Sequence, residues 1–387
     1  MNTFELDEKY VAHTYKRFPL EIVSGKGSLV CSADGKEYID MGSGIAVTSF
    51  GVADEDWIAA AEQQLRAVQH MSNLYYTAPC ARLAEQLCLR TGLSRVFFGN
   101  SGAEANECAI KAARKWAAET KGPRCCTIVT LENSFHGRTL STLAATGQAH
   151  YHELFQPLTP GFAHFPAGNL SALASLCRDG TVAAVLIECV QGEGGVVPLS
   201  QAFARDLEAF LKERNILLMV DEVQTGNGRT GSLYAYMHYG LHPDVVTTAK
   251  GLAGGLPLGA CLLGEMVQDV LSFGDHGSTF GGNPVACAAA LSVLNRLTDP
   301  FLQDVREKGA LLRSLLEGAP GILSVSGLGL MLGVQTEKPA PEVVRACMDE
   351  GVLCLTAKDK VRLLPALNIP EDLLRRAAAV LRAACAP

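Results

Sequence analysis

The sequence predicts an α/β protein with a large, mostly parallel β-sheet and a second, smaller α+β part. From about residue 80, apolar runs of strand length alternate with segments of helical period. The apolar runs show no alternation with polar residues, as expected of strands buried on both faces of a parallel sheet. After about residue 285, amphipathic helices instead flank shorter strands, which is typical of an α+β arrangement.

The individual elements can be placed along the chain. Residues 28–41 contain two short strand-like runs around a glycine turn and predict a hairpin. A strand over 95–100 leads into a helix that begins at Ser101, and Glu104 completes a capping-box pattern. Further strands are expected at 127–132, 182–190, 216–223, 244–249, 259–264, 328–336 and 352–356. Further helices are expected at 81–92, 203–215, 283–297, 307–318, 340–351 and 371–384.

These elements suggest a division into two domains. Residues 46–285 are expected to form the large domain. Residues 286–387 are expected to form the small domain together with residues 1–45, which carry the hairpin. Ligands of open parallel sheets bind beyond the carboxyl ends of the strands, so functional side chains are expected there.

The composition indicates a well-packed globular protein. Of 387 residues, 48% are hydrophobic and 19% are charged, and a chain of this length can bury a large core. A net charge of −7 argues against nucleic acid as a partner, because phosphate binding requires a basic surface. No apolar run approaches the roughly 20 residues of a membrane helix, and the polar N-terminus lacks the apolar segment of a signal peptide.

The thirteen cysteines include no CxxC pair and lie scattered among apolar residues. This pattern is typical of free thiols in a reducing compartment, and we expect a cytoplasmic protein. His150 and His152 form an HxH pattern, and Cys125 and Cys126 are adjacent. No partner cluster at ligand spacing accompanies them, so no metal site is expected.

Four strand ends carry residues suited to a chemical role. At the first, Ser101, Gly102 and Ala103 open a helix directly after a strand. Free backbone N–H groups and the positive end of the helix dipole suit a phosphate at such a place. The segment lacks the GxxxxGK and GxGxxG patterns, which favours a single phosphate over a nucleotide. An ordinary capped helix is the alternative.

At the second strand end, Phe135 and Arg138 follow the strand at 127–132. A phenyl ring can stack on a planar ligand, and a guanidinium can hold a carboxylate through two hydrogen bonds. A loop aromatic and a surface arginine are the alternative.

At the third and fourth strand ends stand a carboxylate and a lysine. Asp221 ends an apolar run, with Gln224 three positions later, and a buried carboxylate requires a cationic or N–H partner. Lys250 ends the strand at 244–249, where burial would disfavour the ammonium and leave a nucleophilic amine. The alternatives are a turn-capping aspartate and a lysine whose stem reaches water. Together, the four sites match pyridoxal 5′-phosphate (PLP), which requires a phosphate cradle, a stacking ring, a carboxylate and a lysine.

The chain resembles the class III (ornithine-type) aminotransferases of PLP fold type I over essentially its full length. The segments NSGAEANE, FHGR, QGEGG, DEVQTGNGRTG, TTAKGLAGGLPLG and STFGGNP occur in the family's order. The GSGIAV segment, the HYG at 238–240 and the compact length most resemble the bacterial acetylornithine aminotransferases within that family.

The resemblance implies roles for the residues around the cofactor ring. Lys250 would form a Schiff base with PLP and then move the substrate's proton. Asp221 would pair with the pyridine nitrogen, and Gln224 would lie near the phenolic oxygen. Phe135 would stack on the ring.

The resemblance also implies how the phosphate is held. Ser101, Gly102 and Ala103 would bind it within one subunit. In the family, the hydroxyl that matches Thr279 reaches the phosphate of the neighbouring subunit. The active unit would therefore be a homodimer with shared sites.

Two arginines would hold the substrates. The resemblance implies that Arg138 binds the distal carboxylate of the amino donor and that Arg362 binds the α-carboxylate of glutamate. Glu193 would pair with Arg362 while an ω-amine is bound, so that one site accepts a monocarboxylate and then a dicarboxylate. A static ion pair is the alternative.

The chain departs from the family pattern in three places. The segment FGVADED, residues 50–56, replaces the family's Gly-His-x-His-Pro, so any role of those histidines is absent. Cys189 stands where a proline is usual. Ile45 occupies the position of a tyrosine that holds the free α-amino group in ornithine δ-aminotransferases. An apolar residue there suits an acylated nitrogen, although it also suits other ω-amines.

The expected reaction moves the δ-amine of N2-acetyl-L-ornithine to 2-oxoglutarate, giving N-acetyl-L-glutamate 5-semialdehyde and L-glutamate in arginine biosynthesis. Within the family, the alternatives are succinylornithine, ornithine, 4-aminobutyrate and carrier-bound aminoadipate semialdehyde transaminases. Outside transamination, a PLP aminomutase or racemase of the same fold and a binding protein with a degenerate site are the alternatives.

Overall fold

The computed structural model describes all residues 1–387, and its largest element is a seven-stranded sheet. The strands, in their order across the sheet, are β4 (Arg95–Gly99), β12 (Gly259–Leu263), β11 (Val245–Thr248), β10 (Leu217–Asp221), β7 (Val182–Ile187), β5 (Thr127–Leu131) and β6 (Phe162–Phe165). Neighbouring strands from β11 to β6 are parallel, whereas β12 is antiparallel to both β11 and β4. The predicted mostly parallel sheet is confirmed.

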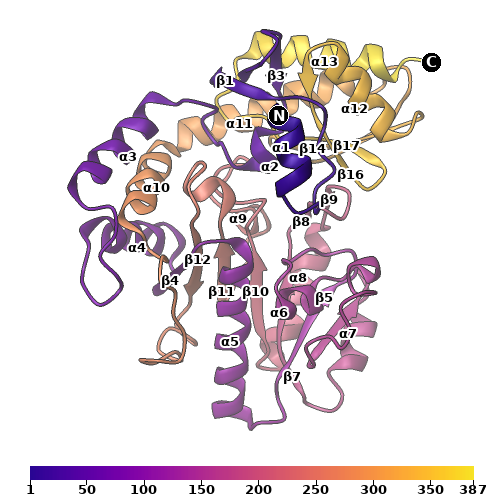
Figure 1. The fold of residues 1–387 in the computed structure, drawn as a ribbon. Helices are drawn as coiled ribbons and strands as arrows, with labels where there is room; N and C mark the ends of the chain where they lie inside the picture. The colour runs from indigo at the N-terminus through magenta and orange to yellow at the C-terminus, as the bar shows by residue number, and fades with distance from the viewer.

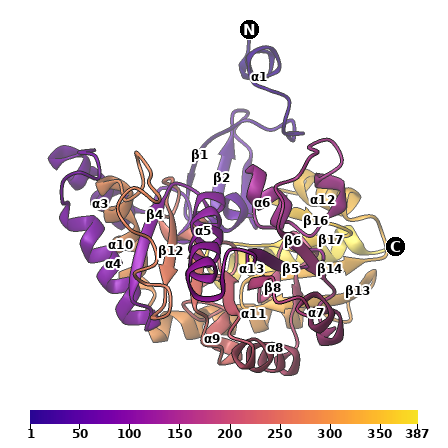
Figure 2. The same cartoon turned by 90° about the horizontal axis from the view of Figure 1, so that it is seen from below.

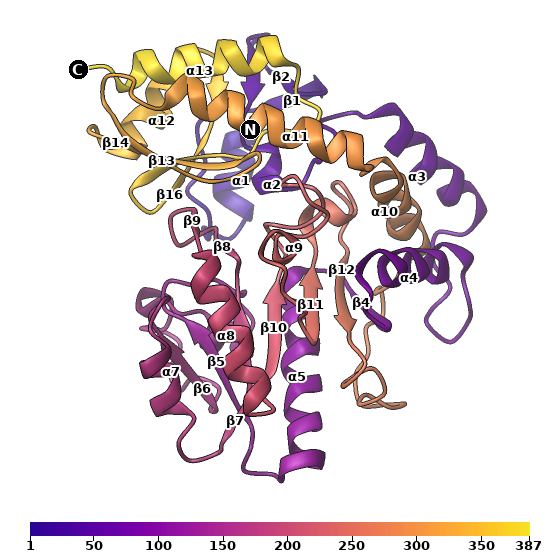
Figure 3. The ribbon, with the colours of Figure 1, turned by 180° about the vertical axis from the view of Figure 1, so that it is seen from behind.

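Helices cover both faces of this sheet. Helix α5 (Gly102–Lys121) lies in front of the sheet in Figure 1, and α8 (Gln201–Glu213) lies on the opposite face, which is in front in Figure 3. Helices α3 (Glu55–Ala67), α4 (Ala78–Thr91) and α10 (Pro284–Arg296) pack together beside β4. The short elements of this region are α6 (Leu140–Ala145), α7 (Leu170–Leu176), α9 (Tyr236–Tyr239), the 3₁₀ turns η1 (Ala149–Tyr151) and η2 (Lys250–Leu252), and the strand pair β8 (Val190–Gln191) and β9 (Val197–Pro198).

The remaining strands form two four-stranded sheets. One has the order β1 (Ile22–Lys26), β2 (Leu29–Ser32), β3 (Glu37–Asp40) and β15 (Val352–Leu353). The other has the order β13 (Ile322–Leu328), β14 (Met331–Thr336), β17 (Lys360–Leu363) and β16 (Leu355–Ala357). Helices α11 (Asp299–Leu316), α12 (Ala340–Asp349) and α13 (Glu371–Cys385) lie beside them at the top of Figure 1.

The N-terminal segment joins the C-terminal one, as expected. Strands β2 and β3 form the predicted antiparallel hairpin, and β15 pairs with β3 in parallel. The domain bounds at residues 45 and 285 stay a prediction. Helix α1 (Thr3–Tyr10) buries no residue and projects from the rest of the chain in Figure 2, and α2 (Ser43–Ala46) is a single left-handed turn.

Three details differ from the sequence-based expectations. The strand expected at 328–336 is β14 together with the end of β13, because the chain turns between them to form a hairpin. The strand expected at 352–356 is split at Cys354 into β15 and β16, which belong to different sheets. Ser101 caps α5, but the Glu104 carboxylate accepts the N–H of Asn100 at 2.8 Å rather than that of Ser101, so the capping box is not formed.

Residues of the FGVADED segment have structural contacts in place of the family's histidines. Asp54 caps α3 by accepting the N–H of Trp57 at 3.0 Å. The same carboxylate forms an ion pair with Arg296 of α10 at 2.8 Å. The segment therefore fastens α3 to α10.

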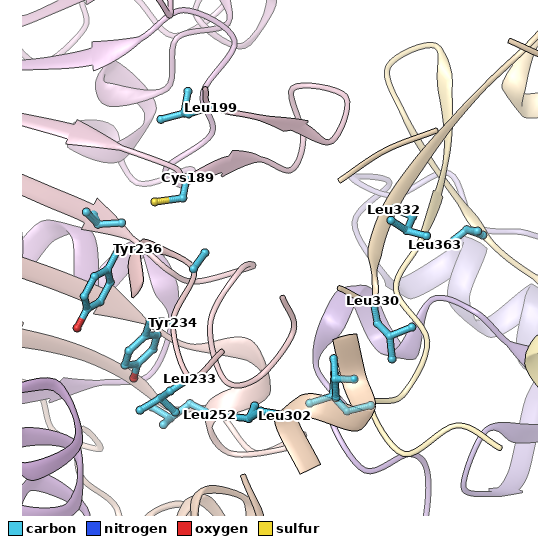
Figure 4. Close-up of a cluster of buried hydrophobic side chains, with 14 of the residues drawn as sticks. Cys189, Leu199, Leu233, Tyr234, Tyr236, Leu252, Leu302, Leu330, Leu332 and Leu363 are labelled. Atoms are coloured by element: carbon cyan, nitrogen blue, oxygen red, sulfur yellow. The ribbon is translucent and has the colours of Figure 1, made fainter. Parts of the chain in front are cut away.

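The buried hydrophobic side chains form three clusters. The largest has 67 buried residues between Ile39 and Cys385 and includes side chains from both parts of the chain. Figure 4 shows members of this cluster that lie beside the large sheet, such as Cys189 and Tyr234. It also shows Leu330, from the turn between β13 and β14, and Leu363 from β17. No helix is both long enough and apolar enough to cross a membrane.

Arg229 links the two parts of the chain by buried hydrogen bonds. Its Nη1 donates to the carbonyl oxygens of Leu330 at 3.1 Å and Pro365 at 2.5 Å, and the side chain is only 2% exposed. Burial lowers the pKa of Arg229 to about 9, and the charge of Asp40 opposes this shift. The guanidinium therefore satisfies carbonyl groups that no water can reach.

We expect Arg229→Met to lower the free energy of unfolding by about 2–4 kcal/mol, because it leaves buried carbonyl groups without donors. Urea unfolding followed by circular dichroism measures the loss. Arg345→Met is the matched control, since Arg345 is exposed and makes no hydrogen bond or ion pair. Equal midpoints for the two variants would contradict the role given to Arg229.

Candidate active site

Lys250 lies in a cavity of about 430 Å³ at the carboxyl ends of the parallel strands. The cavity is lined by residues that follow several different strands of the sheet. They include Asn100, Ser101, Gly102 and Ala103 after β4, Phe135, His136 and Arg138 after β5, Glu188 and Glu193 after β7, Asp221, Val223 and Gln224 at β10, and Lys250 after β11. The structure therefore brings the four predicted strand ends to one place.

Lys250 begins the turn η2 directly after β11. It adopts a left-handed backbone with φ +45°, which is uncommon for a residue other than glycine. Its ammonium makes no hydrogen bond or ion pair within the chain. Burial lowers the pKa of Lys250 to about 8; the charge of Glu193 opposes this shift, and that of Arg362 adds to it. Near neutral pH the ammonium is therefore still the major form, but the neutral amine is far more abundant than at a pKa of 10.5.

Asp221 is 3% exposed and has a donor for each carboxylate oxygen. Its Oδ2 accepts from Asn106 Nδ2 and lies 2.8 Å from His136 Nδ1. Its Oδ1 accepts the backbone N–H of Val223 at 2.9 Å. The expected need for an N–H partner is met inside the protein, and the carboxylate also lines the cavity.

Asn106 and His136 are site residues that the sequence interpretation did not assign. Asn106 is on the buried face of α5, donates also to the His136 carbonyl at 2.8 Å, and accepts from Thr247 Oγ1 at 2.7 Å. The buried Nε2 of His136 has no partner. The signal for Asn106 was a lone polar residue among the small apolar residues of its helix face.

The start of α5 provides the predicted anion site. The N–H groups of Gly102 and Ala103, at the first positions of the helix, have no intrahelical acceptor. Gly102 packs against Val223: a Cβ at this position would lie 2.7 Å from Val223 Cγ1. A larger residue at 102 would therefore displace Val223 from the cavity wall.

Glu193 and Arg362 form an ion pair beside Lys250. Arg362 Nη1 lies 2.5 Å from Glu193 Oε1, and the arginine side chain is 4% exposed. Gln224 bridges them, donating to Glu193 at 3.1 Å and accepting from Arg362 at 3.1 Å. Burial raises the pKa of Glu193, but the charge and hydrogen bond of Arg362, with help from Lys250 and Gln224, bring it below its usual value.

Two features keep this pair in place. A Cβ at Gly192 would lie 2.3 Å from Gln224 Oε1, so a glycine is required next to Glu193. Arg362 comes from β17, a strand that was not expected from the sequence, and β17 pairs with β14. Gln224 thus contacts the two charged groups, and its expected place near a cofactor oxygen stays a prediction.

Glu188 is a further buried carboxylate that the sequence interpretation missed. It accepts the N–H of Phe135 at 3.0 Å and that of Gly192 at 3.2 Å, and so connects the loops after β5 and β7. Burial raises the pKa of Glu188 to about 7, although the charge of His136 opposes the rise. Its position at the end of an apolar run was the same signal that identified Asp221.

Phe135 and Arg138 both line the cavity, as predicted. Phe135 is half-buried, whereas Arg138 is exposed and forms no ion pair or hydrogen bond within the chain. An arginine at a cavity wall that has no carboxylate partner in the protein is available for a carboxylate of a ligand.

Thr279 and Ile45 lie outside this cavity. Thr279 lines a second cavity of about 200 Å³ together with Tyr75 and Tyr76. Ile45 lines a third, apolar cavity of about 370 Å³. Its backbone is left-handed, with φ +66°, which is rare for a β-branched residue. Their roles in binding stay predictions, and Val47 lines the Lys250 cavity instead.

The residues present fit a phosphorylated pyridine aldehyde. The start of α5 offers N–H groups for a phosphate, Asp221 offers an acceptor for a ring N–H⁺, and Lys250 offers an unpaired amine. Phe135 and Val223 contribute apolar surface for a planar ring. These groups come from the ends of four strands, β4, β5, β10 and β11, which explains why no single motif sufficed to identify the site.

The chain is similar to known proteins over nearly its full length. It matches the family described as Aminotransferase class-III over residues 10–385. An acetylornithine aminotransferase of Haemophilus ducreyi is 51% identical to it over 379 residues, covering 97% of this chain and 96% of the relative.

Solved structures give the same result. An N-acetylornithine aminotransferase from Stenotrophomonas maltophilia superposes with a TM-score of 0.85 at 34% identity and covers 98% of both chains. An ornithine aminotransferase from Toxoplasma gondii, described with partial occupancy of PLP at its active site, has a TM-score of 0.93 at 33% identity. It covers 98% of this chain and 93% of its own.

We expect Lys250 in protein prepared without cofactor to react with an amine-acylating reagent at a rate that rises with pH through about 8. The neutral amine is the reactive form, so the rate falls below that pH and levels off above it. Mass spectrometry of the labelled peptide measures the midpoint.

Two variants sharpen this prediction. Glu193→Gln removes a charge that raises the pKa of Lys250, so its midpoint should fall. Arg362→Met removes a charge that lowers this pKa, so its midpoint should rise. Shifts in the same direction, or a midpoint near 10.5 in the unmodified chain, would refute the electrostatic account.

Proposed function

The chain belongs to the class III aminotransferases, which makes it a PLP-dependent transaminase, and we propose that it acts on N2-acetyl-L-ornithine. It transfers the δ-amino group to 2-oxoglutarate and gives N-acetyl-L-glutamate 5-semialdehyde and L-glutamate. The observation that carries this proposal is the Glu193–Arg362 ion pair beside Lys250, with the unpaired Arg138 on the same cavity wall.

The two arginines account for the two substrates. The donor has one carboxylate, far from the reacting δ-amine, and Arg138 binds it while Glu193 neutralises Arg362. Glutamate and 2-oxoglutarate have two carboxylates, and the one next to the reacting carbon replaces Glu193 on Arg362. Because Glu193 is the more exposed partner, at 26% against 4% for Arg362, it is the group that moves.

The chain's own groups then have defined tasks. When bound, PLP supplies an electrophilic carbonyl and an electron-withdrawing ring. Asp221, fixed by Asn106 and His136, presents an acceptor that keeps a ring N–H⁺ protonated. The lowered pKa of Lys250 would let its Nζ take a proton from the substrate carbon that bears the amine and deliver it two atoms further on, across the nitrogen.

The relatives support the choice of donor. The Haemophilus ducreyi relative named acetylornithine aminotransferase is 51% identical to this chain, whereas the solved ornithine aminotransferase is 33% identical. The resemblance also supports it, because the apolar Ile45 matches a tyrosine that holds the free α-amino group in ornithine δ-aminotransferases; within one chain Ile45 lies outside the Lys250 cavity.

We also propose that the active unit is a homodimer, in which Thr279 completes the partner's phosphate site. Thr279 lines a different cavity from Lys250, together with the strongly exposed Tyr75 and Tyr76. Large apolar side chains that are exposed together mark interaction surfaces. Light scattering, which measures the mass of the protein in solution, tests for the dimer. The free state of all thirteen cysteines supports a cytoplasmic location.

A donor panel tests the proposed substrate. Purified enzyme with PLP and 2-oxoglutarate is assayed with acetylornithine, succinylornithine, ornithine and 4-aminobutyrate. We expect the highest kcat/KM with acetylornithine. A higher value with ornithine would overturn the interpretation of Ile45, and turnover without any 2-oxo acid would instead indicate a mutase or racemase.

The half-reaction with glutamate and the half-reaction with acetylornithine should respond differently when the Glu193–Arg362 ion pair is broken by substitution. Arg362→Met should lower the single-turnover efficiency with glutamate about 100-fold, because it removes a buried charge-assisted contact to the α-carboxylate. Its effect on the acetylornithine half should be much smaller.

Glu193→Gln should show the reverse pattern. The acetylornithine half should slow, because Arg362 then stays unneutralised beside a substrate that lacks a second carboxylate, whereas the glutamate half should be retained. Stopped-flow absorbance of the cofactor measures each half separately. Glu265→Gln, at an exposed and unpaired glutamate, is the control. Equal losses in both halves would indicate a static ion pair.

A further inference from the structure

Tyr151 contacts both Phe135 and Arg138, which lie in the loop after β5. Tyr151 itself does not line the Lys250 cavity. The guanidinium carbon of Arg138 is 5.5 Å from the centre of the Tyr151 ring. The ring of Phe135 meets the same ring edge-on, with centroids 5.7 Å apart and planes at 64°. One side chain outside the cavity thus contacts two that line it.

Arg138 has no other fixed partner in the chain. It is exposed and forms neither an ion pair nor a hydrogen bond. A long side chain of this kind samples many rotamers in water, and ordering it costs free energy on ligand binding. A cation–π contact with Tyr151 restricts these rotamers without neutralising the charge.

Tyr151 is itself well anchored. It closes the turn η1, where its N–H donates to the carbonyl of Gln148 at 3.1 Å. The buried Gln148 side chain donates to the carbonyl of Ser134 at 3.1 Å, and the N–H of Gly147 donates to Ser134 Oγ at 3.0 Å. The turn is therefore fastened to the residue that precedes Phe135.

The two histidines of the HxH pattern flank this tyrosine. The ring of His150 lies 4.0 Å from that of Tyr151, centre to centre. His152 Nε2 is 2.9 Å from the carbonyl oxygen of Leu143. The Tyr151 hydroxyl forms no hydrogen bond in the chain, so its contacts are those of the ring alone.

From this geometry we propose that Tyr151 is a positioning residue that orients Arg138 for the distal carboxylate of the amino donor. The proposal rests on the proposed function, in which Arg138 binds that carboxylate. The Tyr151 ring contacts the guanidinium and ties it to the turn η1, which is also fastened to the residue before Phe135. Selectivity for donors with a distal carboxylate thus depends on a ring that touches neither substrate nor cofactor.

A matched pair of donors tests this role in the holoenzyme. N-Acetylputrescine is acetylornithine without its carboxylate, so it cannot use Arg138. We expect Tyr151→Leu to raise KM for acetylornithine about fivefold, with kcat largely kept, because a cation–π contact of ordinary strength is lost. KM for N-acetylputrescine should not change. Tyr151→Phe keeps the ring and should behave as the unmodified enzyme with both donors.

The outcomes separate the two proposals. Arg138→Met should raise KM for acetylornithine in every background; if it does not, the assigned role of Arg138 fails. Suppose that Arg138→Met raises KM for acetylornithine as expected. The proposal for Tyr151 is then overturned if Tyr151→Leu has no effect, or if Tyr151→Leu raises KM for both donors equally. Tyr151→Met is a second variant should the leucine variant not fold, and the absorbance of bound cofactor verifies that each variant is loaded.

Discussion

The burial of the Asp221 carboxylate is the constraint on which the rest of the site depends. An unpaired carboxylate at this depth would cost several kcal/mol, so donors have to be brought to it from elsewhere in the chain. They come from α5 through Asn106, from the loop after β5 through His136, and from the turn after β10 through the N–H of Val223. Satisfying one carboxylate therefore fixes three segments relative to one another. The start of α5 and the ring of Phe135 consequently face the same cavity as Lys250.

The charges of the cavity form a second, linked system. Glu193 neutralises Arg362 and at the same time raises the pKa of Lys250, against the larger effect of burial. A substrate carboxylate that takes the place of Glu193 on Arg362 brings a negative charge back to the same position. The electrostatic surroundings of Lys250 are thus similar with either substrate. In the proposed reaction, one amine then serves both directions of proton transfer without a change in its environment.

Much of the fold and half of the site could be predicted from the sequence. The rest could not be predicted, for physical reasons. Continuous apolar runs predict buried strands, and Asp221 and Lys250 were identified as polar residues at the ends of such runs. Glu188 carried the same signal but was read as part of its strand. His136 could not be assigned, because its partner is 85 positions away in the chain. Strands β15 to β17 are too short to show a periodic pattern. The sequence therefore predicted neither the split at Cys354 nor the strand that carries Arg362. Thr279 and Ile45 were placed by resemblance alone, and within one chain they lie in other cavities.

The pairing of β3 with β15 has a consequence for biosynthesis. Ile39 finds its neighbour, Val352, only when nearly the whole chain has left the ribosome. Until then the hairpin of β2 and β3 presents an open edge, which is the kind of surface at which nascent chains associate wrongly. Arg362 arrives with the same late segment. A truncated translation product therefore lacks both the strand that pairs with β3 and the arginine that forms the ion pair with Glu193.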